Sequence, residues 1–133
     1  VERLSGSSDI SQDRRGFLWR HRLALLATLL LAVTIAWGTL TPTPPTPDLM
    51  GPLSDKLYHV MAFAGLVFPT ALLYARGLIW ILPLAALFGG AIELVQPYMG
   101  REAEVADVLA DLVGLGLGMV TGLALRAWLR RHA

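Results

Sequence analysis

Four long runs of apolar residues dominate the chain, and short polar segments separate them. The runs cover residues 23–40, 57–75, 78–96 and 108–127. Each run is close to the ~20 residues that a helix needs to cross the hydrocarbon core of a bilayer, which is about 30 Å thick. The pattern therefore predicts an all-α fold, namely a polytopic membrane protein built as a bundle of four transmembrane helices.

The segments outside the apolar runs complete the predicted domain organisation. The transmembrane domain covers residues 23–129, with a tail of residues 1–22 before it and a tail of residues 130–133 after it. Residues 1–16 are rich in Ser, Asp and Arg, and we expect little regular structure there. No small-residue cleavage pattern follows the first apolar run, so we expect a retained span and not a signal peptide.

The connections between the runs differ in kind. Residues 41–52 contain five prolines, which predicts a stiff, extended spacer. Only Arg76 and Gly77 join the second and third runs, so these two helices must be antiparallel neighbours. Gly77 is predicted to be a left-handed helix cap.

Charge is distributed unevenly along the chain, and its distribution predicts the orientation in the membrane. The net charge is only +1, but nine of the 11 Lys and Arg residues precede the first run, join the second to the third, or lie in the last eight positions of the chain. The positive-inside rule therefore places both termini in the cytoplasm. This separation of charge gives no reason to expect nucleic acid as a partner. The absence of cysteine excludes disulfides, thiolate nucleophiles and Cys-ligated metals.

Ionisable residues gather at the predicted outer ends of the helices. Their spacing puts Asp55 with His59, Glu93 with Gln96, and Asp107 with Asp111 on shared helix faces. Such groups are costly at membrane depth and normally face the bundle interior or a water-filled cavity. We therefore predict a candidate binding cluster of eight residues: Asp55, Lys56, His59, Glu93, Gln96, Arg101, Asp107 and Asp111.

Structural interpretations remain open for several members of this cluster. Asp55 and Asp107 each suit a helix's first turn, where negative charge is favourable. Lys56 suits a side chain that extends its ammonium group to the membrane interface. The simplest structural explanation of Glu93 is an ion pair with Arg101 that holds the outer loop.

His59 and Asp111 lie about one turn inside their helices. His59 suits either a buried histidine bonded to a carbonyl or a group that exchanges protons. Asp111 must be protonated or paired, and Lys56, His59 or Arg101 would satisfy it. The cluster contains one histidine with scattered carboxylates and lacks recognisable ligand spacing, so the sequence predicts no metal site and no cofactor.

Three glycines predict where the fourth helix packs. Gly114, Gly118 and Gly122 recur every four residues, which is the spacing of a small-residue face that lets another helix approach closely. Asp107 and Asp111 lie on the same stripe. The acidic face of this helix is therefore also its predicted packing face.

These residues together resemble the VanZ-like family of bacterial membrane proteins. The family pattern runs from Asp-Lys-x-x-His-x-x-x-Phe through Glu-x-x-Gln and a loop Arg to Asp-x-x-x-Asn-x-x-Gly, and the resemblance covers about half of the chain. The matching residues are Asp55, Lys56, His59, Phe63, Glu93, Gln96, Arg101, Asp107, Asp111 and Gly114. Asp111 departs from the usual Asn and adds a negative charge. The resemblance implies a multi-pass protein of the bacterial cytoplasmic membrane, linked to resistance against teicoplanin and related lipoglycopeptides.

Three functions remain open at this point. The first is a polar pocket that binds membrane lipid or a cell-envelope precursor and modulates glycopeptide susceptibility. The second is an enzyme acting on an envelope lipid, with His59 as general acid or base, Glu93 or Asp111 as its partner, and Lys56 or Arg101 stabilising an anion. The third is an accessory subunit that packs against a larger membrane assembly through its glycine face.

Overall fold

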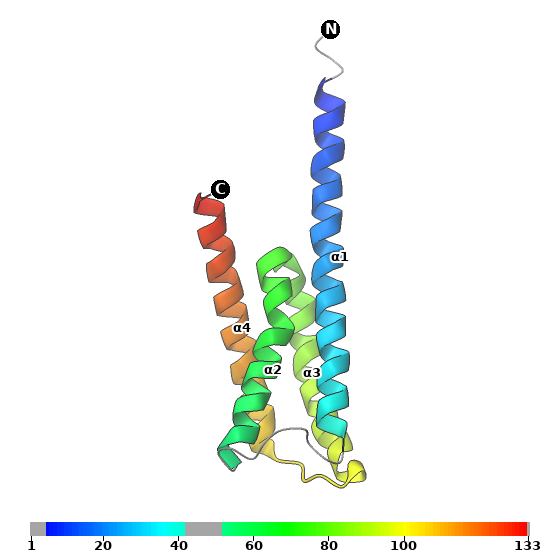
Figure 1. Cartoon of the computed structure of the whole chain (residues 1–133), viewed down its shortest axis with the longest axis vertical. Helices are drawn as coiled ribbons and strands as arrows, with labels where there is room; N and C mark the ends of the chain where they lie inside the picture. The colour runs from blue at the N-terminus through cyan, green and yellow to red at the C-terminus, as the bar shows by residue number, and fades with distance from the viewer. Residues whose placement is uncertain (1–4, 42–51, 133) are drawn as a thin grey trace.

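The computed structural model describes residues 5–41 and 52–132, with side chains described for residues 14–41 and 55–132. All regular structure in these residues is helical (Figure 1). The elements in chain order are α1 (Ser5–Leu40), α2 (Pro52–Leu73), the 3-10 turn η1 (Ala75–Gly77), α3 (Leu78–Val95), the 3-10 turn η2 (Gln96–Met99) and α4 (Val105–His132). The four α-helices overlap the four apolar runs, so the predicted all-α architecture is confirmed. The predicted proline-rich spacer falls on residues 42–51, outside the described residues.

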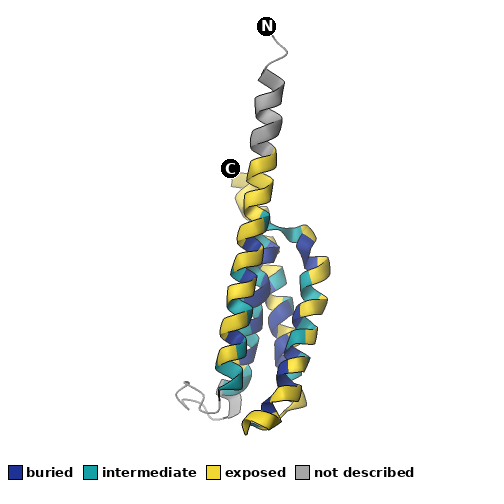
Figure 2. Cartoon of the chain, turned by 90° about the vertical axis from the view of Figure 1, so that its right-hand side faces the viewer, coloured by how far each residue is buried: buried dark blue, intermediate teal, exposed yellow. Residues whose placement is uncertain are grey.

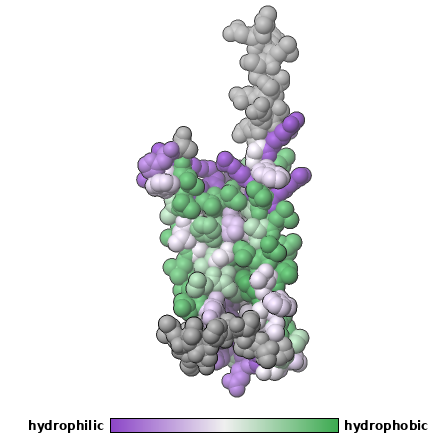
Figure 3. Space-filling view, in the orientation of Figure 1, coloured by the Kyte–Doolittle hydropathy of each residue, from purple (hydrophilic) through white to green (hydrophobic). Residues whose placement is uncertain are grey.

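Apolar side chains cover the sides of the bundle. Leu30, Ile79, Leu87 and Val120 are each more than half exposed, and Figure 3 shows a broad hydrophobic belt between two ends that carry hydrophilic residues. An apolar surface of this extent marks a contact with lipid or protein. Because all four helices are long and apolar enough to cross a membrane, the chain is a multi-pass membrane protein.

The two ends of the bundle differ in charge. We call one the acidic end; it comprises residues 38–41, 55–59 and 93–111, at the bottom of Figure 1. We call the other the basic end; it comprises residues 14–22, 73–78 and 126–132, at the top. At the basic end, Arg20, Arg76, Arg126 and Arg130 line a cavity of about 680 Å³.

Helix α1 is longer than the apolar run that predicted it. It begins at Ser5 and contains 36 residues, which at 1.5 Å per residue gives a length of about 54 Å. The expectation of little regular structure in residues 1–16 is therefore wrong from Ser5 onward. No proline interrupts the helix. Beyond its apolar run, His21 stacks on Tyr74 with ring centroids 4.1 Å apart, which ties α1 to the α2–α3 hairpin.

The hairpin between α2 and α3 is as short as predicted, but it contains no left-handed residue. Gly77 has φ −70° and ψ −18°, so the predicted left-handed cap is wrong. The chain reverses through η1, where the Gly77 N–H donates to the carbonyl oxygen of Tyr74 at 2.8 Å. Glycine is needed here for space, because a Cβ at Gly77 would lie 2.5 Å from Cδ1 of Tyr74.

Helices α2 and α4 form the most extensive contact of the bundle. The glycine face of α4, which consists of Gly114, Gly118 and Gly122, packs directly against α2. A Cβ at Gly118 would overlap the carbonyl oxygen of Ala64, and one at Gly122 would lie 2.6 Å from Cβ of Ala71. The two backbones thus approach as closely as a small-residue face allows, which brings the acids of α4 against the first turns of α2.

A small apolar core lies between the helices. Phe63, Leu66 and Val67 of α2 are almost completely buried within it, and Figure 2 shows buried residues facing inward while the outer surface of α1 is exposed. The hydroxyl groups of Thr28 and Thr70 lie 3.1 Å apart and satisfy each other across α1 and α2. This core fixes α2 at the centre of the bundle, so its first turns are presented at the acidic end.

Candidate functional site

All eight predicted cluster residues lie at the acidic end, on three helices and the loop before α4. Helix α2 contributes Asp55, Lys56 and His59, the end of α3 and η2 contribute Glu93 and Gln96, the loop contributes Arg101, and α4 contributes Asp107 and Asp111. Ion pairs and hydrogen bonds join the α2 members to the α4 members across up to 52 positions of the chain, and Gln96 and Arg101 both donate to the carbonyl oxygen of Thr39 in α1. The predicted convergence of three helix faces therefore occurs in the fold.

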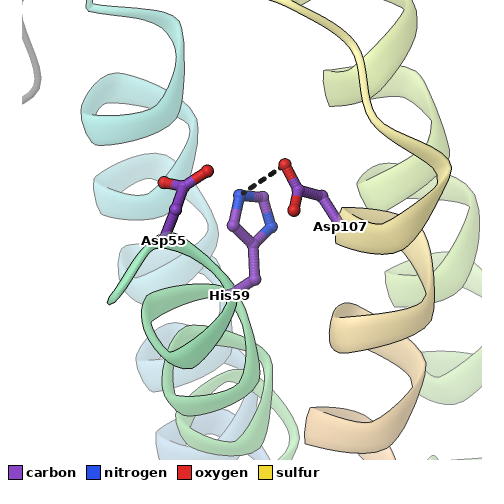
Figure 4. Close-up of side chains that lie close together, drawn as sticks. All are labelled: Asp55, His59 and Asp107. Carbon is purple, nitrogen blue, oxygen red and sulfur yellow. Dashed lines mark ion pairs between the residues drawn. The ribbon is translucent and has the colours of Figure 1, made fainter. Parts of the chain in front are cut away.

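His59 is the centre of the cluster. Its Nδ1 lies 2.8 Å from Oδ1 of Asp111. On the other side of the ring its Nε2 lies 3.8 Å from Oδ2 of Asp107, and Figure 4 marks this second contact with a dashed line. His59 is only 4% exposed and Asp111 only 2%. The sequence left Lys56, His59 and Arg101 as possible partners of Asp111. In the fold its partner is His59. When Nδ1 carries the ring proton it donates to Asp111, which leaves Nε2 with a free lone pair.

Lys56 joins the start of α2 to the start of α4. Its ammonium group contacts carboxylate oxygens of both Glu104 and Asp107, so it is a paired group and not an isolated interfacial charge. Glu104 was not among the predicted cluster residues. Its one signal in the sequence is its position three residues before Asp107. In the fold the Asp107 N–H donates to the Glu104 carbonyl oxygen at 2.9 Å.

Glu93 has a different partner from the one predicted. Its Oε2 accepts the backbone N–H of Glu104 at 2.9 Å, so the predicted ion pair with Arg101 is wrong. Arg101 instead donates to the carbonyl oxygen of Thr39 at 3.0 Å and lies 3.5 Å from Asp55. The reason is the turn at Gly100, whose φ of 76° suits glycine. Arg101 follows that turn directly, and its side chain contacts α1 and α2.

Three buried oxygens of the cluster have no hydrogen-bond partner among the described residues: Oε1 of Glu93, Oε1 of Gln96 and Oδ2 of Asp111. Gln96 is 1% exposed and donates only a long bond of 3.4 Å to Thr39. Buried polar atoms are nearly always satisfied in folded proteins, by protein, water or an ion. These oxygens are therefore the positions in the cluster where a water, a proton or a ligand would be held.

A cavity of about 410 Å³ opens beside the cluster between α1 and α2. We call it the α1/α2 cavity; its lining residues are Ile35, Gly38, Thr39, Asp55, Tyr58, His59, Met61, Ala62, Phe63 and Arg101. One part of the lining is apolar and the other carries an acid, an imidazole and a guanidinium group. The cavity therefore suits a molecule with an apolar segment and a charged group.

The cluster has the parts for two kinds of chemistry. The His59–Asp111 pair can accept or release a proton next to the cavity. In addition, Asp55, His59 and Asp107 each offer a ligand atom, and these atoms lie within 4.8 Å of one another (Figure 4). The sequence predicted no metal site, because these three residues have no recognisable spacing along the chain; the fold brings them together from two helices.

Comparison with known proteins does not add to this description. No family model, curated protein or solved structure matches the chain. The resemblance to the VanZ-like family therefore rests on the motif residues alone.

Proposed function

We propose that the protein is a VanZ-like membrane protein that binds an envelope lipid or a lipid-linked cell-envelope precursor at its acidic end. In this proposal it lies in the bacterial cytoplasmic membrane with both termini in the cytoplasm. Support for the orientation comes from the basic residues, since nine of the 11 belong to the terminal segments or the α2–α3 hairpin. The acidic end then faces the cell exterior, where envelope precursors are displayed.

The observation that carries the proposal is the mixed lining of the α1/α2 cavity. Ile35, Ala62 and Phe63 offer an apolar wall, while Arg101 and His59 lie at the same cavity. An amphiphile could place its chain against that wall and its anionic headgroup against the guanidinium group of Arg101. The lateral position between two helices suits a ligand that arrives from the bilayer.

Binding of lipid in the cavity can be tested by native mass spectrometry of the detergent-purified protein. Ala62→Leu adds side-chain volume to the cavity wall, whereas Ala91→Leu makes the same change at an exposed position of α3. We expect lipid to co-purify with the wild type and with Ala91→Leu, and about tenfold less of it with Ala62→Leu. Equal lipid occupancy in both variants would contradict binding in this cavity.

The proposed effect on glycopeptide susceptibility rests on the family resemblance alone, so it is tested by a separate experiment. We would measure teicoplanin susceptibility of a bacterial host expressing the wild type, Glu93→Gln or Glu102→Gln, with membrane levels confirmed. Glu102 is an exposed acid of the same loop and serves as the charge-matched control. The proposal expects the wild type and Glu102→Gln to change susceptibility and Glu93→Gln to have no effect. If the wild type leaves susceptibility unchanged, the resistance role is wrong.

A second candidate function is an acid–base enzyme acting on an envelope lipid. It is favoured by one observation, the buried His59–Asp111 pair beside a cavity that also contains Arg101. An enzyme should lose turnover of lipid with His59→Gln while still binding that lipid; a binding protein should show no turnover in the wild type. The accessory-subunit hypothesis would need a surface other than the glycine face, since α2 covers that face.

A further inference from the structure

Three possible ligand atoms of the cluster lie close together in the fold, although the spacing of their residues along the chain does not predict this. Oxygens of Asp55 and Asp107 and a ring nitrogen of His59 all lie within 4.8 Å of one another, and Figure 4 shows the imidazole between the two carboxylates. We propose that these three residues bind a divalent transition-metal cation, with Zn²⁺ as the best match. This site does not depend on the lipid proposal, because metal binding can be measured without any lipid.

The separation between His59 and Asp107 fits two ligands of one ion better than it fits a hydrogen bond. Nε2 of His59 and Oδ2 of Asp107 are 3.8 Å apart, beyond the normal hydrogen-bond range. Two ligands on a tetrahedral ion with bonds of about 2.1 Å lie about 3.4 Å apart. A shift of a few tenths of an ångström would bring both atoms into coordination.

Asp111 prepares His59 for this role. Its Oδ1 lies 2.8 Å from Nδ1 of His59; a proton on Nδ1 would donate to this oxygen and leave the lone pair at Nε2 for a metal ion. Metal-binding histidines usually donate their second ring nitrogen to a carboxylate or carbonyl in this way, which fixes the tautomer. Lys56 contacts Oδ1 of Asp107, whereas Oδ2 is the oxygen on the side of His59.

The excess of carboxyl groups in the cluster also favours the binding of a cation. Five carboxyl groups meet here, those of Asp55, Glu93, Glu104, Asp107 and Asp111, and the described residues supply only Lys56 and Arg101 as permanent positive charges beside them. Glu93, Asp107 and Asp111 are all more than nine-tenths buried. Excess negative charge in a buried site is unfavourable unless it is protonated or neutralised. A bound divalent cation would remove most of that excess.

The ligand set selects the metal class and leaves a coordination position free. Imidazole favours zinc and its neighbours, whereas magnesium and calcium favour sites made of oxygen alone. Three protein ligands leave a fourth tetrahedral position open, as in zinc sites that bind a water or substrate. Asp55 and His59 also line the α1/α2 cavity, so a ligand in the cavity could take that position.

The experiment uses the detergent-purified full chain, made without a polyhistidine tag, stripped with chelator and titrated with Zn²⁺. Calorimetry should show a single Zn²⁺ per chain, with much weaker binding of Mg²⁺. The chain contains only three histidines, so ¹⁵N-histidine NMR can identify the ligand: the His59 resonances should shift, while those of His21 and His132 should not. Absence of Zn²⁺ binding by the folded wild type would overturn the proposal, as would shifts confined to His21 or His132.

Two pairs of variants test the assignment further. Asp55→Asn removes a partly exposed ligand that lies 3.5 Å from Arg101, and its control is Glu102→Gln, a change at an exposed acid in the loop before α4. His59→Gln is matched by His21→Gln at the basic end. Loss of a ligand should weaken Zn²⁺ binding at least about tenfold, and the controls should bind as the wild type does. Wild-type affinity in a folded Asp55→Asn would refute the three-residue site, even if His59→Gln fails to fold.

Discussion

Nδ1 of His59 lies 2.8 Å from Oδ1 of Asp111, although 52 positions separate the two residues in the chain. The contact exists because the glycine face of α4 lets that helix lie directly against α2. Both side chains are buried, so each depends on the other for hydrogen bonding. The packing of α4 against α2 and the hydrogen bonding at the acidic end are therefore coupled. Mutations should reveal this coupling.

The first prediction concerns Asp111 itself. Asp111→Ala should leave Nδ1 of His59 buried without a partner and lower the free energy of unfolding by about 1–3 kcal/mol. Asp111→Asn keeps an oxygen that can accept the Nδ1 proton, so it should cost less than about 1 kcal/mol. Thermal and denaturant unfolding in detergent would measure both. Equal losses for the two variants would show that His59 does not need this partner.

The second prediction concerns the contact between α2 and α4. Gly118→Ala adds a Cβ that would overlap the carbonyl oxygen of Ala64, and backbone cannot move aside easily; we expect a loss of about 1–3 kcal/mol. Gly116 is the matched control, because a Cβ there meets nothing within 4 Å. Gly116→Ala should be neutral or should stabilise the helix by up to about 1 kcal/mol. If both variants unfold alike, α4 does not pack through its glycine face.

The arrangement of helices was predictable from the sequence because it depends on patterns that are local in the chain. The apolar runs and the four-residue spacing of Gly114, Gly118 and Gly122 each predict an element or a packing face without reference to distant residues. The helical extension of α1 toward Ser5 was not predictable from hydropathy. Polar residues allow a helix as readily as a tail, and the contact of His21 with Tyr74 is visible only in the fold.

The pairing inside the cluster was much less predictable. The sequence placed Glu93 and Arg101 at the same end, and opposite charges there suggested an ion pair. Arg101 follows the turn at Gly100, and Glu93 accepts a backbone N–H that any residue except proline would offer at position 104. Charge and depth in the membrane predict which residues lie at the same end of the bundle. Loop geometry decides whether Glu93 and Arg101 bond to each other. The convergence of Asp55, His59 and Asp107 depends instead on how closely α4 packs against α2.

The third prediction concerns Lys56, which is the link between α2 and α4. Lys56→Met would leave the buried carboxylate of Asp107 without its ion pair. The pair is partly exposed on the lysine side, so we expect a loss of about 1–3 kcal/mol, less than for a fully buried pair. Glu104→Gln removes only the half-exposed partner and should cost under about 1 kcal/mol. Unfolding free energies in detergent test both, and a larger effect of Glu104→Gln would reverse this ranking.

The last prediction tests the proposed orientation. Because the chain contains no cysteine, a single introduced cysteine is the only thiol that a maleimide can label. Glu102→Cys lies in the exposed loop at the acidic end, and Arg76→Cys is exposed in the hairpin at the basic end. If the acidic end faces outward, a membrane-impermeant maleimide should label Glu102→Cys in intact cells and Arg76→Cys only after permeabilisation. The reverse pattern would place the acidic end in the cytoplasm, which would contradict binding of envelope precursors from outside because His59 and the α1/α2 cavity lie at that end.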